Sequence, residues 1–84
     1  MRHALPATID ALKETLDAVR ARPELRERKH GTFYRKAAGF LHMHEDPAGL
    51  FADVKGAGGW ERMQVDTPEQ RQALLDRIEA ILSD

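Results

Sequence analysis

The first part of the chain has the hydrophobic pattern of an amphipathic helix. In residues 6–21 the apolar side chains recur at spacings of three and four, which places on one stripe Ile9, Leu12, Leu16 and Val19. This pattern predicts a helix over residues 6–21, with Pro6 in its first turn. Pro23 interrupts the pattern, so we predict a short second helical turn over residues 23–29 that ends at Gly31.

The middle of the chain changes to the alternating pattern of β-strands. The strand-like segments are "TFYRK", "GFLHMH", "GLFADVK" and "WERMQV", which together predict about four antiparallel strands. The turn-forming residues "EDPA", at 45–48, join the second and third segments as a four-residue hairpin loop. The glycine-rich residues 56–59 form the next loop, and Trp60 is expected to anchor that loop to the body of the protein.

The last segment carries a complete helix start signal. Thr67 is the predicted N-cap, Pro68 takes the first helical position, and Gln70 lies three residues after the cap. The predicted buried stripe consists of Leu74, Leu75, Ile78, Ile81 and Leu82.

The order of these elements predicts a single α+β domain over residues 1–84. Each helix has one apolar face to bury, so the simplest arrangement has two layers. It packs the N-terminal and the C-terminal helix on one face of an antiparallel sheet of about four strands. The other face of the sheet, here called the outer face, is then open to solvent or to a partner.

Strand alternation predicts which side chains occupy the outer face. Leu41 and Met43 share one side of their strand, and the next strand has an apolar side that matches them. Pairing His44 with Gly49 leaves the 45–48 loop and places His42 opposite Phe51 and Phe40 opposite Asp53. The predicted binding residues of the outer face are therefore Phe40, His42, His44, Phe51 and Asp53.

Two kinds of chemistry fit this predicted face. Exposed aromatic residues such as Phe40 and Phe51 are usually covered, here by a ligand, by a second subunit in a homodimer, or by residues 23–29 or the glycine loop of the same chain. His42 and His44 can share zinc or another divalent metal, although the spacing matches no known zinc motif. The candidates for a third ligand are His30, Glu45, Asp46 and Asp53. No nucleophile accompanies either histidine, so we assign no catalytic residue and favour a protein that is not an enzyme.

Positive charge is concentrated in residues 20–36, around Phe33 and Tyr34. Cations interleaved with aromatic rings can bind single-stranded nucleic acid through phosphate contacts and base stacking. The alternative is a solvated helix end, where cations suit the negative end of the helix dipole. The residues predicted for nucleic-acid binding are Arg26, Arg28, Lys29, Arg35 and Lys36.

Composition narrows these alternatives. The net charge of −1 gives the whole chain no attraction for nucleic acid or anionic membranes. The absence of cysteine excludes disulfides, thiolate metal sites and cysteine nucleophiles. No apolar run approaches the ~20 residues of a membrane span, and the first residues lack the apolar stretch of a signal peptide, so we expect a cytoplasmic protein.

The segment "TFYRKAAGFLHMHEDPAGLFADVKGAGGWERMQV", followed by the capped helix, resembles small bacterial α+β domains of the YjbR/MmcQ type. "FLHMHEDPAGLFADVK" with "GGWERM" is also similar to the bacterial luciferase-like domain of unknown function. Both resemblances imply the α+β fold and neither implies a settled activity, although YjbR-type domains are sometimes proposed to bind nucleic acid. The expected function is a non-enzymatic binding or self-associating module that uses the outer face, with metal binding and nucleic-acid binding as alternatives.

Overall fold

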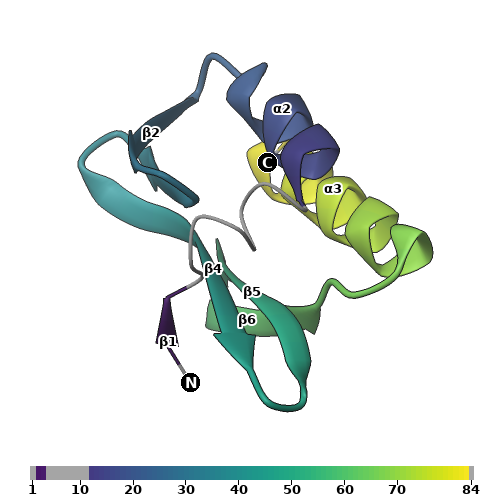
Figure 1. The fold of residues 1–84 in the computed structure, drawn as a ribbon. Coiled ribbons are helices and arrows are strands. Elements are labelled where there is room, and N and C mark those ends of the chain that lie inside the picture. The colour runs from purple at the N-terminus through teal and green to yellow at the C-terminus, as the bar shows by residue number, and fades with distance from the viewer. Residues whose placement is uncertain (1, 4–11, 84) are drawn as a thin grey trace.

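The computed structural model of the protein describes residues 2–3 and 12–83, and this part of the chain has an α+β fold (Figure 1). Five strands form one sheet in the order β2-β3-β4-β5-β6, every neighbouring pair antiparallel, and β1 also pairs with β4. The elements are β1 (Arg2–His3), α2 (Lys13–Arg20), β2 (Leu25–Lys29), β3 (Thr32–Arg35), β4 (Ala38–Asp46), β5 (Gly49–Gly56), β6 (Gly59–Gln64) and α3 (Pro68–Leu82). The α+β class is as predicted, and the sheet contains β2 and the short β1 in addition to the four strands expected.

The helix α2 begins at Lys13, directly after a turn at Leu12. Leu16 and Val19 are buried, in agreement with the predicted apolar stripe. The earlier part of the predicted helix, including Pro6 and Ile9, lies outside the residues that the structure describes.

The predicted helical turn over residues 23–29 is wrong, because Leu25–Lys29 is the strand β2. Its side chains alternate, with Leu25 buried, Arg26 exposed and Glu27 half-buried against α2. The pairing with β3 explains the error, because hydrogen bonds to a neighbouring strand decide the structure of a short charged segment with little preference of its own. Gly31 therefore belongs to the two-residue turn of the β2–β3 hairpin, where its φ of 82° suits glycine.

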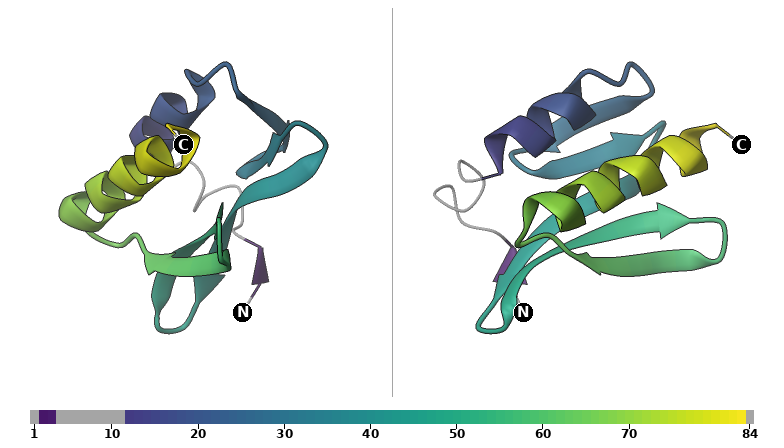
Figure 2. Two further views of the ribbon diagram at one scale, coloured as in Figure 1. Left: turned by 180° about the vertical axis from the view of Figure 1, so that it is seen from behind. Right: turned by 90° about the vertical axis from the view of Figure 1, so that its right-hand side faces the viewer.

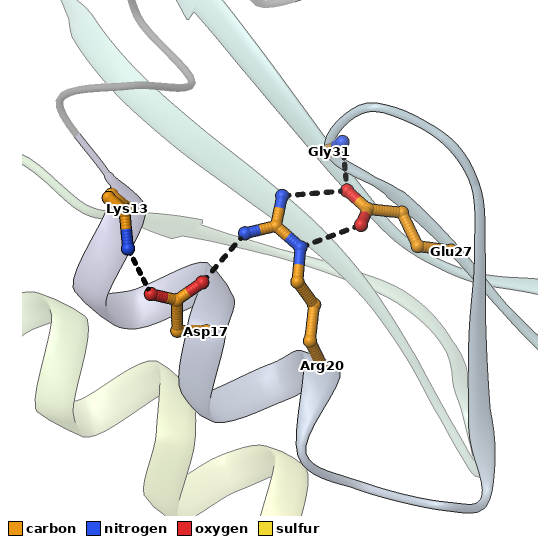
Figure 3. Close-up of polar contacts among 5 residues, drawn as sticks. All are labelled: Lys13, Asp17, Arg20, Glu27 and Gly31. Atoms are coloured by element: carbon orange, nitrogen blue, oxygen red, sulfur yellow. Dashed lines mark hydrogen bonds and ion pairs between the residues drawn. The ribbon is translucent and has the colours of Figure 1, made fainter.

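An ion-pair network joins α2 to this hairpin (Figure 3). The Arg20 guanidinium donates from Nε to Glu27 Oε1 at 2.7 Å and from Nη2 to Glu27 Oε2 at 3.0 Å, and also donates to Asp17. The backbone N–H of Gly31 donates to the same Glu27 carboxylate at 2.8 Å. The hydrogen bonds from Arg20 hold the pKa of Glu27 below its usual range, so this carboxylate is charged at neutral pH and fastens the hairpin turn to the helix.

The helix α3 begins as the sequence predicts. Thr67 is the N-cap, its hydroxyl accepts from the backbone N–H of Gln70 at 3.1 Å, and the Gln70 side chain accepts from the backbone N–H of Thr67. This reciprocal capping box satisfies donors that the first helical turn would otherwise leave unpaired. The buried residues of α3 are Leu74, Ile78 and Ile81, all three within the predicted stripe.

One buried hydrophobic cluster contains residues from both helices and from the strands. Its strand members include Phe33, Leu41, Met43, Ala52 and Val54, and its helix members are Leu16, Val19, Leu74, Ile78 and Ile81. Figure 2 shows α2 and α3 side by side next to the curled sheet, with α2 nearer β2 and α3 nearer β5 and β6. Among the described residues, no helix is long and apolar enough to cross a membrane.

Candidate functional site on the outer face of the sheet

The β4–β5 hairpin places both histidines on the outer face. His42 lies opposite Asp53 and His44 opposite Phe51, while Leu41 and Met43 project to the other side and are 0% and 2% exposed. The orientation of the histidines is as predicted.

The register differs by two residues from the prediction, because the strands continue to Asp46 and Gly49. The connecting turn is therefore Pro47 and Ala48 rather than residues 45–48. Its geometry depends on the Asp46 carboxylate, which accepts from the Ala48 backbone N–H at 3.0 Å, and on Gly49 with a φ of 138°.

Phe40 does not belong to the outer face, contrary to the prediction. Phe33 lies opposite Leu41 and Tyr34 opposite Gly39, so Phe40 is an extra residue in β4. A β-bulge of this kind interrupts the alternation of side chains. Phe40 consequently points into the core with Leu41 and is 2% exposed.

Gly39 takes the outer position instead, and the Trp60 ring lies beside it. A Cβ built on Gly39 would lie 3.3 Å from His42 Nε2, which is a tight contact, and 3.7 Å from Trp60 Cη2, which is an ordinary van der Waals contact. The ring centroids of His42 and Trp60 are 5.1 Å apart, and Lys55 Nζ lies 5.3 Å from the Trp60 ring centroid. The indole lies against the sheet on the outer face and remains 49% exposed.

A chain of polar contacts continues along the outer face from His44. His44 Nε2 is 3.0 Å from Asp53 Oδ2, and the Arg62 guanidinium donates to both oxygens of the same carboxylate at 2.8 and 3.1 Å. The hydrogen bonds from Arg62 are the main cause of a lowered pKa of Asp53, and the charges of Arg62, His44 and His42 add to the effect. The centroids of the His42 and His44 rings lie 6.0 Å apart, so this chain of polar contacts lies next to the contact between His42 and Trp60.

The lowered pKa of Asp53 makes the stability of the protein depend on pH. A depressed carboxyl pKa contributes stability above the unfolded-state value of about 3.9, and this contribution is lost as the pH falls through the folded-state pKa. We expect wild type to unfold at higher urea concentration than Asp53→Asn at neutral pH, and the difference to shrink as the pH falls from about 4 to about 2. In an Arg62→Gln background the pH-dependent difference should shrink, because the main cause of the shift is gone. A difference that stays constant over that pH range contradicts the role given to Arg62.

The basic residues predicted for nucleic-acid binding are divided between two sides of the sheet. Arg26, Arg28 and Lys29 are exposed on β2, and Arg28 Cζ lies 5.4 Å from the centroid of the Tyr34 ring. By register Arg26 lies opposite Tyr34, and Lys29 lies opposite Thr32, the neighbour of His42, so these positions belong to the outer face.

The other basic residues of this segment point elsewhere. Arg35 lies opposite Leu25 and Ala38, at positions that share the core side of the sheet. Lys36 is in the β3–β4 turn with a φ of 58°. Arg20 and Arg22 pair with Glu27 and Glu79, so they are engaged with the helices and the first hairpin.

The predicted metal site on His42 and His44 has no third ligand among the described residues. Asp53 is near both histidines but already accepts two hydrogen bonds from Arg62. His30 lies in the β2–β3 turn, and Glu45 alternates to the side opposite His44. In the part of the chain that the structure describes, no group of three or more His, Asp or Glu side chains is arranged to hold a metal ion.

Comparisons of the chain with protein-family models, curated proteins and solved structures gave no match in any of the three, so the resemblances drawn from the sequence remain predictions. The site therefore has to be interpreted from its own residues. Sequence reasoning did not include Tyr34, Lys55, Trp60 and Arg62 in the outer face. The glycine before Phe40 was the available signal, since an isolated glycine within a strand often marks a bulge or a close approach of another group.

Proposed function

We propose that the protein is a non-enzymatic binding module in which the two helices cover one face of the sheet and the outer face binds a partner. The observation that supports this most strongly is the position of Trp60. An indole has a large apolar surface, and keeping it half in water forgoes much of the free energy of burial. Here the ring packs beside Gly39, His42 and Lys55, an arrangement that supports a surface preorganised for a ligand.

The charges of the outer face favour a different molecule over a second copy of this chain. In a two-fold dimer the same patch meets itself, so the cations Arg28, Lys29 and Lys55 would be brought against the equally positive face of the second copy. Stable homodimers also bury a hydrophobic patch within a total of about 1,200–2,000 Å² or more. Among the described residues, Trp60 is the only large hydrophobic side chain that is exposed, which is too little for such an interface.

Nuclear magnetic resonance with a panel of chemically different probes tests the use of this face. The probes are oligothymidylate, inorganic polyphosphate and a neutral oligosaccharide, and sedimentation at increasing protein concentration tests a second copy. We expect at least one probe to shift the Trp60 indole and His42 imidazole signals, while methyl signals of Leu74 and Ile78 in the core stay in place. In Trp60→Ala the His42 shift should be much reduced. If no probe moves these signals and the protein sediments as a monomer throughout, the proposal fails.

A further inference from the structure

We propose that the partner of the outer face is a single-stranded nucleic acid, whose bases stack on Trp60 and Tyr34 and whose phosphates meet the flanking cations. This inference rests on the proposed function, because it assigns a ligand to the same face. Four observations support it: the arrangement of the aromatic rings, the position of the cations, the distribution of the carboxylates, and the exposure of Trp60.

The aromatic side chains form a row across the sheet, defined here as Tyr34, His42 and Trp60. Tyr34 on β3 lies opposite Gly39 on β4, and the Trp60 ring of β6 reaches over β5 to within van der Waals distance of the Gly39 position. The His42 ring lies 5.1 Å from the indole centroid. Bases of any sequence can stack on such rings, because every base has a π-face.

A cation lies over each end of the aromatic row. Arg28 Cζ is 5.4 Å from the Tyr34 centroid, and Lys55 Nζ is 5.3 Å from the Trp60 centroid. Both side chains are exposed, and neither forms an ion pair with another described residue. A strand whose bases contact the two rings can therefore place phosphates beside two cations that have no carboxylate partner within residues 12–83.

The carboxylates near the sheet are arranged so that the outer face is positive although the whole chain has a net charge of −1. Glu27 and Glu61 alternate to the helix side, where they pair with Arg20 and Arg77. Two carboxylates share the outer face: Asp53 pairs with Arg62 and lies 3.0 Å from His44 Nε2, and the charge of Asp46 also acts on Arg62. The net charge of the sequence is therefore close to zero, although cations predominate on the outer face of the sheet.

Single strands fit this surface better than duplexes. Trp60 is 49% exposed, and a base can stack on it only when that base is unpaired and unstacked from its neighbours. A duplex would contact the cations alone and leave the rings unused. The inference therefore retains Arg26, Arg28 and Lys29 from the predicted basic residues and adds Lys55. It omits Arg35 and Lys36. The stacking surfaces are the rings of the aromatic row.

Fluorescence anisotropy of labelled oligothymidylate and oligouridylate, each of about 12 nucleotides, tests the inference. We expect Trp60→Ala to weaken binding about tenfold or more, and Trp60→Phe to restore part of the loss, because phenylalanine keeps a stacking face. Lys55→Ala should weaken binding and reduce the slope of log K against log salt by about 0.7.

Lys13→Ala, which removes an exposed cation from α2, is the matched control and should leave binding unchanged. A duplex of equal length should bind more weakly, and the comparison of the two oligonucleotides shows whether the sugar matters.

Three results would overturn the inference: no binding of either oligonucleotide at low salt, unchanged affinity in Trp60→Ala, or equal losses in Lys13→Ala and Lys55→Ala. Circular dichroism of each variant excludes loss of fold, which is not expected at exposed positions. If the oligonucleotides fail while polyphosphate, the oligosaccharide or a second copy shifts the Trp60 signals, the inference fails and the proposed function stands. If no probe shifts them, both fail.

Discussion

Replacing Phe40 with alanine is expected to destabilise the protein by about 3–5 kcal/mol, the usual cost of removing a buried aromatic ring. The ring is 2% exposed and belongs to the cluster that joins the helices to the strands. A small domain has a total stability of only about 5–15 kcal/mol, so a substantial fraction of the variant should be unfolded. Urea unfolding followed by circular dichroism measures the effect.

Phe51→Ala is the matched control, because it removes the same side chain from the outer face of the adjacent strand. Phe51 is half-buried opposite His44, so its loss should cost clearly less than that of Phe40. An unbroken alternation in β4 would place both rings on the outer face. Equal and small costs for the two variants would therefore contradict the bulge.

Replacing Gly49 with alanine is expected to destabilise the protein by about 1–3 kcal/mol. The φ of 138° is one that residues with a side chain rarely adopt, and a Cβ would overlap the Asp66 carboxylate. That carboxylate accepts from the Leu50 backbone N–H at 2.9 Å, directly before the start of α3. The substitution should therefore disturb both the hairpin turn and the connection from β6 to α3, and the urea midpoint should fall.

Gly58→Ala provides the comparison within the next hairpin. A Cβ on Gly58 would meet no atom within 4 Å, and its φ is in the ordinary negative range. Alanine there should be neutral, or stabilising by about 0.4–1 kcal/mol, through the lower entropy of the unfolded chain. Similar losses at both glycines would show that the strain at Gly49 has been overestimated.

The features that were predictable from sequence have local causes. The capping box of α3 depends on Thr67, Pro68 and Gln70, which lie within one helical turn of each other. The alternation of apolar residues in β4 and β5 predicted that Leu41 and Met43 face the core and that His42 and His44 face away. Each of these features requires information from a few neighbouring residues only.

The features that were missed depend on pairing between strands. The apolar residues in 25–29 follow neither the period of a helix nor that of a strand. Pairing with β3 therefore determines that this segment is a strand. A shift of two residues in the β4–β5 register keeps every side chain on its face, so hydrophobic matching cannot detect it. The position of Phe40 depends on a bulge that forms only where β4 meets β3.

The candidate site follows the same division. His42, His44, Phe51 and Asp53 were assigned to the outer face because alternation within one hairpin is sufficient to place them. Trp60 could not be placed in this way, because its ring reaches β4 across another strand. Its contacts with Gly39 and His42 become apparent only once three strands are assembled.

The exposure of Trp60 also affects how unfolding of this protein can be observed. The chain has a single tryptophan, and its indole is already half in water in the folded state. Intrinsic emission should therefore shift little in wavelength when the core melts, and a denaturation curve recorded only at the emission maximum would understate the transition. The same property makes the indole a selective optical reporter, since changes in its emission arise from the surface of the sheet and not from the interior.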